Sequence, residues 1–263
     1  MALTLGTTAL NKLYLGSMAI NKAYLGANVL IAASSSLVVS RVVFSSGATV
    51  PETTHDNSAF WGADAGEEDN LYNFALDLSG AVVGDLLLVA AGGRRAIAGL
   101  ALDGTAMTQE IYSNNGVYRA AGLWSHVVTS GDISGTTPLV LTGTEQERGI
   151  TALLVKGGVL QQVAKDDGNN VGFTLSVTAT DARNEVVGIA FGEGNAFSST
   201  GYAMGNLTLV ETLGWEDHDS ALGNIGVAYG TTSNISVGSF SSTFTPVTGR
   251  DSAGLLILLE PSA

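Results

Sequence analysis

DLLLVAAGGRRAIAGLALDGTAMTQEIY, residues 85–112, is the stretch that decides the fold class of this chain. Residues 85–91 form a short apolar run of the kind found in buried strands. Residues 96–102 end at Asp103-Gly104, a dipeptide typical of two-residue hairpins, and 107–112 supply the returning strand. The stretch therefore predicts consecutive antiparallel strands.

The same pattern continues on both sides of this stretch. We expect further strands at 37–44, 71–78, 117–128, 138–141 and 149–155. Residues 45–70 contain Pro, Gly and acidic residues and are expected to form a long exposed loop, with Phe60 and Trp61 turned inward. A long window of 3.6-residue periodicity with helix caps is missing. The sequence therefore predicts an all-β chain.

The second part of the chain resembles the first. DLLLVAAGG from Asp85 parallels EVVGIAFGEG from Glu185, and RGITALLVKG from Arg148 parallels SAGLLILLE from Ser252. These similarities define two pseudo-repeats, about 85–157 and 184–260. We expect a jelly-roll-like antiparallel β-sandwich built from two similar halves, with two small tandem sandwiches as the alternative. One sandwich is favoured because the sequence shows no linker between the halves.

The first 34 residues repeat with a period of ten: LTLGTTALNK, LYLGSMAINK and AYLGANVLIA. A helix would turn its apolar face by about 80° per repeat, so this period favours short strands with glycine at the turns. Strands of three or four residues are not stable alone, so we interpret 1–34 as an assembly arm and 35–263 as the body. An N-terminal sheet packed on its own body is the alternative. The arm residues expected to make the contacts are Leu5, Gly6, Leu15, Gly16, Ile20, Tyr24, Leu25 and Gly26.

Composition and charge exclude several classes of function. The net charge is −13, and because the arm carries two lysines and no acid, the body alone carries −15. Such a body repels nucleic-acid phosphates, so we expect no nucleic-acid partner. The chain contains no cysteine and no apolar run of transmembrane length, and it lacks the charged segment that opens a signal peptide. We therefore expect cytoplasmic synthesis and no membrane insertion.

Two acidic stretches are candidates for chemistry. The first is the run of five residues from Trp215 to Asp219, in which Glu216, Asp217, His218 and Asp219 follow the tryptophan. Its acids and imidazole suit a divalent cation or, with the indole ring, a sugar. The alternative is a solvated loop anchored by its Trp. Residues 67–69 with His55 and Asp56 form a second cluster, whose paired acids would suit a hydrolase only at a defined separation. Trp61 lies in the same loop and is a further candidate ligand-binding residue.

Nucleophile, dinucleotide and nucleotide motifs are missing from the sequence. It has no GxSxG elbow, Gly192-Glu193-Gly194 lacks the third glycine of a dinucleotide fingerprint, and GGRR at 92–95 lacks the lysine of a phosphate-binding loop. We therefore expect no enzymatic activity and no cofactor. Whether a metal ion is bound stays open.

A family resemblance rests on the arm and the body. LYLGSMAINKAYLGANVLI resembles the YLGS-x-x-I-x-K-x-YLG arms at the N-termini of virion proteins of tailed bacteriophages and gene-transfer-agent particles. GDLLLVAAGG, AAGLWSHVVTSGD and RGITALLVKGG resemble pieces of the C-terminal β-sandwich domains of phage fibres and spikes. The arm covers about an eighth of the chain, and the body similarity is the less specific.

The resemblance implies a non-enzymatic spike, fibre or decoration protein on the virion surface of a tailed phage or phage-like particle. Its expected partners are two further copies of itself in a homotrimer, other head or tail proteins, and host-surface glycans. A carbohydrate-binding or carbohydrate-degrading tailspike and a bacterial surface adhesin are the alternatives. The sequence leaves open whether the protein sits on head or tail.

Overall fold

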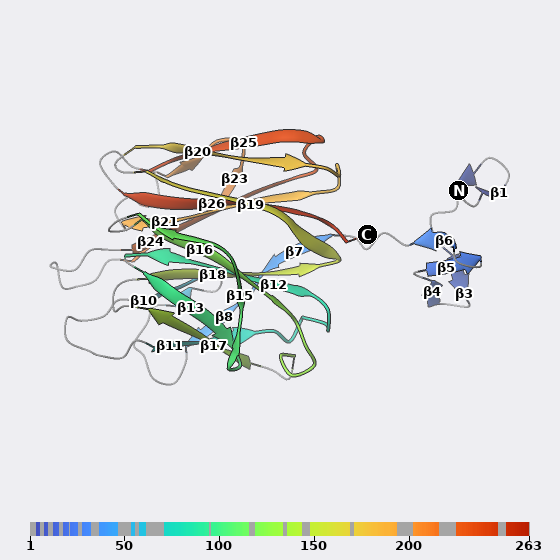
Figure 1. Cartoon of the computed structure of the whole chain (residues 1–263), viewed down its shortest axis with the longest axis horizontal. Coiled ribbons are helices and arrows are strands. Elements are labelled where there is room, and N and C mark those ends of the chain that lie inside the picture. The colour runs from blue at the N-terminus through green and yellow to red at the C-terminus, as the bar shows by residue number, and fades with distance from the viewer. Residues whose placement is uncertain are drawn as a thin grey trace.

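The computed structural model describes residues 4–5, 8–9, 13–15, 18–20, 22–25, 28–32, 37–46, 54–55, 58–61, 71–94, 96–115, 119–133, 136–143, 148–168, 171–193, 202–215, 225–246 and 251–262. All regular elements in these residues are β-strands, which confirms the predicted all-β class (Figure 1). The ladders are antiparallel and collect into sheets that pack face to face.

The arm consists of three separate two-stranded hairpins, one for each ten-residue repeat. The pairs are β1 (Thr4–Leu5) with β2 (Thr8–Ala9), β3 (Leu13–Leu15) with β4 (Met18–Ile20), and β5 (Lys22–Leu25) with β6 (Asn28–Ala32). Two residues separate the strands of each pair, and the first of the two is always glycine. Glycine in that position is the sequence signature of a two-residue hairpin, which explains why the repeat has this length.

The first half of the body contains two sheets. Inner sheet 1 has the order β15-β16-β12-β18, and β18 also pairs with β7 and with the β10–β9 hairpin. Its strands are β7 (Val38–Arg41), β9 (Thr54–His55), β10 (Ser58–Trp61), β12 (Leu86–Gly93), β15 (Thr108–Asn114), β16 (Ala120–Val127) and β18 (Arg148–Lys156). Outer sheet 1 has the order β14-β13-β17-β11-β8. Its strands are β8 (Phe44–Ser46), β11 (Leu71–Asp77), β13 (Ile97–Leu102), β14 (Thr105–Ala106) and β17 (Thr136–Gly143).

The second half contains two further sheets. Inner sheet 2 has the order β19-β26-β21-β24-β23, and outer sheet 2 has the order β20-β25-β22. The strands of the inner sheet are β19 (Gly158–Gly168), β21 (Glu185–Glu193), β23 (Thr208–Trp215), β24 (Ile225–Ser233) and β26 (Ser252–Pro261). Those of the outer sheet are β20 (Phe173–Ala179), β22 (Ala203–Met204) and β25 (Gly238–Thr245).

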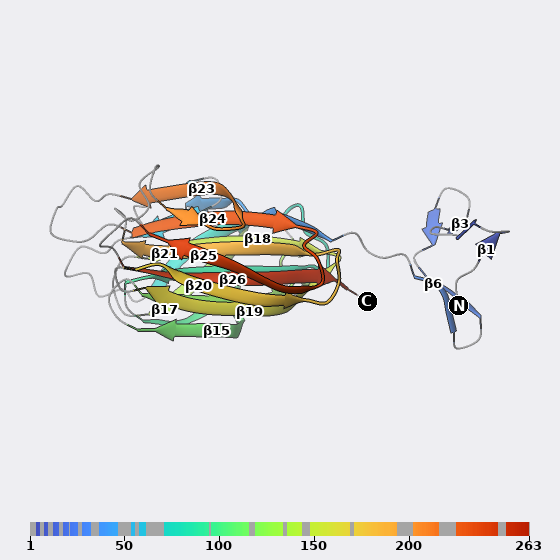
Figure 2. The same ribbon diagram turned by 90° about the horizontal axis from the view of Figure 1, so that it is seen from above.

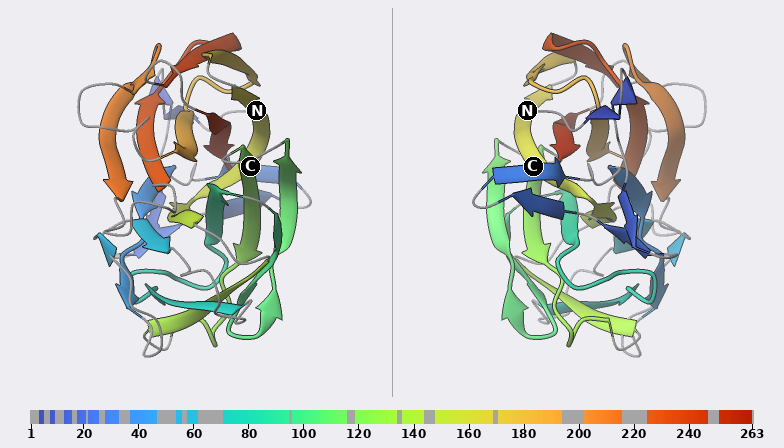
Figure 3. Two further views of the ribbon diagram at one scale, coloured as in Figure 1. Left: turned by 90° about the vertical axis from the view of Figure 1, so that its left-hand side faces the viewer. Right: turned by 90° about the vertical axis from the view of Figure 1, so that its right-hand side faces the viewer.

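Three hydrophobic cores separate the four sheets. The first lies between outer and inner sheet 1 and contains Leu76 and Trp124. The third lies between inner and outer sheet 2, where the rings of Phe173 and Phe244 stack with centroids 5.3 Å apart. The second joins the two inner sheets, as Figures 1 and 3 show from the side and along the strands. The body is therefore four layers deep.

This layering corrects the interpretation that each half supplies one sheet of a single sandwich. Each half forms its own sandwich, and the two sandwiches stack through their inner sheets. The reason lies in the central strands: β12 and β26 are buried along nearly their whole length, because both of their faces pack against another sheet. In Figure 2 the strands of both halves run along the long dimension of the body.

The two halves correspond strand for strand. The order β15-β16-β12-β18-β7 matches β23-β24-β21-β26-β19, and β13-β17-β11 matches β22-β25-β20. A β-bulge lies at the same place in both, between Gln109 and Ile111 on β15 and between Leu209 and Glu211 on β23. In the structural alignment of the two halves, Leu86 and not Asp85 is the equivalent of Glu185. Leu86 pairs with Val155 of β18, and Glu185 pairs with Leu259 at the equivalent position of β26.

Residues 45–70 are not the continuous loop that the sequence predicts. β10 pairs with residues 148–151 of β18, and β9 pairs with β10. The physical reason is the length of β18: β7 covers only its residues 153–156, which leaves the other end of that edge open for β10. The predicted strand 37–44 is also divided, because the Val42 amide bonds to β18 while the Val43 carbonyl accepts from Asp77 of outer sheet 1.

Candidate functional site

The body has two ends, defined by its strand register. At the near end β7 begins and the chain finishes, with Val38 paired to Lys156 and Pro261 paired to Gly158. At the far end β15, β17, β21 and β23 finish, and the segments 116–118, 144–147, 194–201 and 216–224 that continue from them lie outside the described residues. Loops on a rigid scaffold are where recognition residues usually lie, so the far end is the candidate functional site.

The two candidate tryptophans belong to strands that finish at this end. Trp61 is the last residue of β10 and pairs with Arg148, and Trp215 is the last residue of β23 and pairs with Ile225. Asp217, His218 and Asp219 lie outside the described residues, as do Glu67–Asp69 of the second acidic stretch. A ligand site built from these residues therefore stays a prediction.

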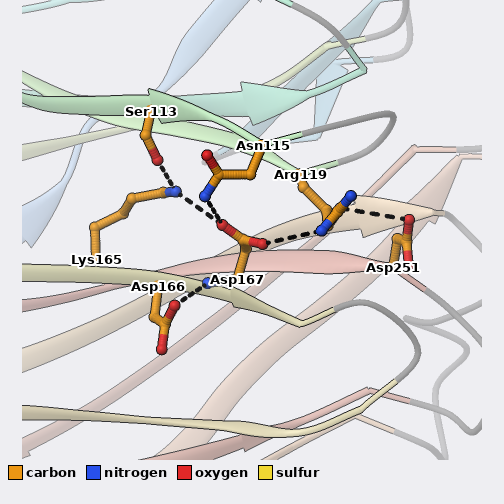
Figure 4. Close-up of polar contacts among 7 residues, drawn as sticks. All are labelled: Ser113, Asn115, Arg119, Lys165, Asp166, Asp167 and Asp251. Atoms are coloured by element: carbon orange, nitrogen blue, oxygen red, sulfur yellow. Dashed lines mark hydrogen bonds and ion pairs between the residues drawn. The ribbon is translucent and has the colours of Figure 1, made fainter.

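A polar cluster lies beside the far end, where β15 and β16 of the first half meet β19 of the second (Figure 4). Asp167 is its centre. Its Oδ2 atom accepts hydrogen bonds from Asn115 Nδ2 and, at 3.3 Å, from Lys165 Nζ. Its Oδ1 atom is 3.4 Å from a guanidinium nitrogen of Arg119.

The cluster is largely shielded from water. The Lys165 side chain is 5% exposed and the Asp167 side chain is 8% exposed. Lys165 also donates to Ser113 Oγ, and Arg119 Nε lies 3.7 Å from Asp251 Oδ2. Because buried charges are costly unless they are paired, this arrangement fixes the register of the two halves at one edge of their interface.

A second polar contact joins the halves at the opposite edge. The Arg41 guanidinium on β7 forms an ion pair with Glu211 on β23, and its centre lies 4.7 Å from the ring centroid of Tyr229. Cation–π contacts of this kind are worth about 0.5–2 kcal/mol. Burial comes first among the effects on the Tyr229 phenol and raises its pKa to about 12, so this ring stays neutral at physiological pH.

Buried carboxylates hold the loops at the near end. Asp132 Oδ2 accepts from the Thr129 amide at 2.6 Å and contacts His126 Nε2 at 2.9 Å. Burial favours the neutral form of this carboxyl, but the hydrogen bonds from Thr129 and His126 outweigh it, and the pKa of Asp132 lies below its ordinary value. Glu260 accepts in the same way from the amides of Thr180 and Asp181, which lowers its pKa despite burial.

No strand was predicted for residues 158–184. β19 and the residues that it contributes to the polar cluster were therefore not predicted. The signal is the run GVLQQVAKDDG, in which Lys165 and Asp167 stand two residues apart and share one face of a strand. Period-two spacing places them together, but their burial follows only from the second half stacking on the first. Asn115 and Arg119 come from the connection between β15 and β16. Arg119 falls within the predicted strand 117–128, but β16 begins only at Ala120.

The predicted arm residues divide between described and undescribed positions. Leu5, Leu15, Ile20, Tyr24 and Leu25 belong to hairpin strands, and Leu13 pairs with Ile20 across β3 and β4. Gly6, Gly16 and Gly26 lie outside the described residues. Their part in assembly stays a prediction.

Two further observations concern the described residues as a whole. Among them, no group of three or more His, Asp or Glu side chains is placed to hold a metal ion. The same residues include no helix that is long and apolar enough to cross a membrane.

Comparisons with protein-family models, with curated proteins and with solved structures found no match to this chain.

Proposed function

We propose that this chain is a structural component of a tailed-phage or phage-like particle, a trimeric spike, fibre or decoration protein that attaches through its arm and projects its body. The observation that carries the proposal is the arm: three hairpins that form three separate two-stranded sheets. Isolated two-stranded hairpins are marginal in water, so the apolar residues of the repeats need another surface to cover them.

The body supports the same proposal through its independence. Its three cores are built from residues between Leu37 and Leu259. Strong negative charge keeps such a body soluble and separate from its neighbours on a crowded particle, whereas the arm carries only positive charge.

Truncation of the arm tests this proposal. A chain beginning at Ser35 should keep the unfolding transition of the full body, because the cores are intact. Light scattering should give a trimer mass for the full chain and a monomer mass for the truncated chain, and only the full chain should sediment with particles from a producing host. Equal masses for the two chains would refute the role of the arm.

Carbohydrate binding at the far end is a second proposed function, favoured by the strand-end positions of Trp61 and Trp215 at the same end of the body. Indole rings stack on sugar faces and neighbouring acids bind hydroxyls. Trp61→Ala and Trp215→Ala should each reduce binding to host-surface polysaccharide at least tenfold with an unchanged melting temperature. Release of reducing ends from the polysaccharide would favour the degrading tailspike over a binding protein.

A further inference from the structure

Three groups in the polar cluster are arranged for a reaction that joins two side chains. Lys165 supplies a primary amine, Asn115 a carboxamide, and Asp167 a carboxylate. The amine and the amide both contact the same carboxylate oxygen, Asp167 Oδ2 (Figure 4). We propose that Lys165 and Asn115 form an intramolecular isopeptide bond, with Asp167 carrying the protons.

The burial of the cluster suits this reaction. A lysine amine becomes a nucleophile only when it loses its proton, and Asp167 Oδ2 lies 3.3 Å from Lys165 Nζ, where it can accept that proton. Lys165 and Asp167 are nearly completely buried, whereas Asn115 is exposed and gives the leaving group a path to solvent. Ser113 Oγ accepts a second hydrogen bond from the amine and limits its orientation.

The two oxygens of Asp167 have different contacts. Oδ1 lies 3.4 Å from Arg119, whose guanidinium is in turn 3.7 Å from Asp251. Oδ2 contacts both reacting groups. The carboxylate is therefore held on one side and faces the amine and the amide on the other, which is the position that a proton carrier needs. Holding the reactants together in this way replaces a collision by a unimolecular step.

The reaction balances without any other reagent. The Lys165 ammonium gives one proton to Asp167, and the neutral Nζ attacks Asn115 Cγ. Asp167 passes that proton to the Asn115 nitrogen, the Cγ–Nδ2 bond breaks, and ammonia leaves. The ammonia takes the remaining surplus proton from the new amide nitrogen as ammonium. The products are one secondary amide between Nζ and Cγ, one ammonium ion and the Asp167 carboxylate.

The bond would connect the two halves of the body. Asn115 follows β15 at the edge of inner sheet 1, and Lys165 belongs to β19 at the edge of inner sheet 2. The chain has no cysteine, so it has no disulfide to make such a connection. The inference does not depend on the proposed attachment role of the arm.

Mass spectrometry of the full chain tests the bond. We expect the purified wild-type protein to be lighter than its sequence mass by one ammonia molecule, and a protease digest to contain a branched peptide linking Asn115 to Lys165. Lys165→Arg, Asn115→Ala and Asp167→Asn should each have the full sequence mass and yield no branched peptide. Lys156→Arg is the matched control, because Lys156 lies outside the cluster on β18, and it should keep the bond.

Three results would overturn the inference or part of it. A wild-type mass equal to the sequence mass after prolonged incubation at neutral pH would leave Lys165 and Asp167 as an ordinary ion pair. Loss of ammonia that persists in Lys165→Arg would instead indicate cyclisation of Asn115 onto the following Gly116. A branched peptide that still forms in Asp167→Asn would remove the role assigned to Asp167.

Discussion

The two halves of the body share one strand order but differ in the size of the residues that meet between them. Gly92 and Ala90 of β12 correspond in position to Phe191 and Ile189 of β21. The two residues of β12 pair with β16, and the two residues of β21 pair at the matching places with β24, which is the equivalent of β16. At these two positions the first half presents small residues and the second presents large ones. The two faces therefore fit each other but would not fit copies of themselves, which explains why one chain contains one of each.

The glycines of the first half show how closely the faces fit. A Cβ atom added at Gly92 would lie 2.4 Å from the Phe191 ring, and one added at Gly149 would lie 2.6 Å from Val227 Cγ2. These positions need the absence of a side chain, because the ring of Phe191 occupies that space.

Removing the large side chain should have the greatest cost. Phe191 is fully buried in the core between the halves, so Phe191→Ala should lower the free energy of unfolding by about 3–5 kcal/mol. Denaturant unfolding measures this directly. Phe240→Ala is the control, because Phe240 is only partly buried against the third core, and it should cost clearly less. Equal losses of unfolding free energy in the two variants would mean that the core between the halves contributes no more to stability than the third core.

Filling the small position should cost somewhat less. Gly149→Ala places a methyl group against Val227 and, at 3.2 Å, against Phe191 Cδ1, so overpacking should cost about 1–3 kcal/mol. Gly99→Ala is the matched control, since its nearest neighbour would be Thr142 Oγ1 at an ordinary 3.6 Å. In a double-mutant cycle, Val227→Ala should relieve part of the Gly149→Ala cost. Strict additivity of the two changes would contradict the contact.

The near-end loops of the two halves should lose stability together in acid. Asp132 and Glu260 have pKa values below their ordinary ones, so their contributions are present above the unfolded-state pKa of about 4 and disappear as the pH falls through the folded-state pKa. Asp132→Asn and Glu260→Gln should each cost about 1–2 kcal/mol at pH 7, and that difference from wild type should shrink below pH about 4. A pH-independent difference would argue against the charged hydrogen bonds.

The smallest effect should come from Glu185, an acidic residue that stands where the first half has an apolar one. Glu185 corresponds to Leu86, and burial raises its pKa, although Thr231 donates a hydrogen bond to it. A raised folded-state pKa means that wild-type stability falls as the pH rises through that value. Glu185→Gln should therefore be slightly more stable than wild type at pH 7 and equal to it near pH 3. Chemical denaturation at the two pH values measures the difference.

Much of this fold could be predicted from the sequence, because hairpin signals and alternation are local. Asp103-Gly104 is a turn in the structure, with Asp103 at φ 44°, and Asn206 occupies the corresponding turn of the second half at φ 65°. The predicted return through 107–112 is wrong, because only the two residues of β14 return along β13, and β15 pairs with β16 of inner sheet 1. The register of the repeat could not be predicted to the residue. A shift of one position exchanges the two faces of a strand, and in β12 and β21 both faces are apolar, so the pattern does not distinguish Asp85 from Leu86 as the partner of Glu185.

The sequence contains a pattern that indicates four layers, although we predicted a single sandwich with two. LLLVAAGG, ITALLV and AGLLILL are continuous apolar runs, which are typical of strands covered on both faces, whereas FTLSVTA alternates, as expected of a strand with one exposed face. Three such runs indicate a sheet pair buried inside two others. The polar cluster had no comparable signal, because Asn115 and Lys165 meet only after the halves have stacked.

The way in which β7 enters the body has a mechanical consequence. Its four residues, from Val38 to Arg41, pair with β18, and β7 begins at the near end of the body. A pull between the arm and a ligand at the far end would load this ladder in shear, so that its hydrogen bonds resist together instead of opening one after another. Lys165 and Asn115 would then carry tension between the halves. The force that the connection resists would depend on the four residue pairs of β7 with β18 and on this one pair of side chains.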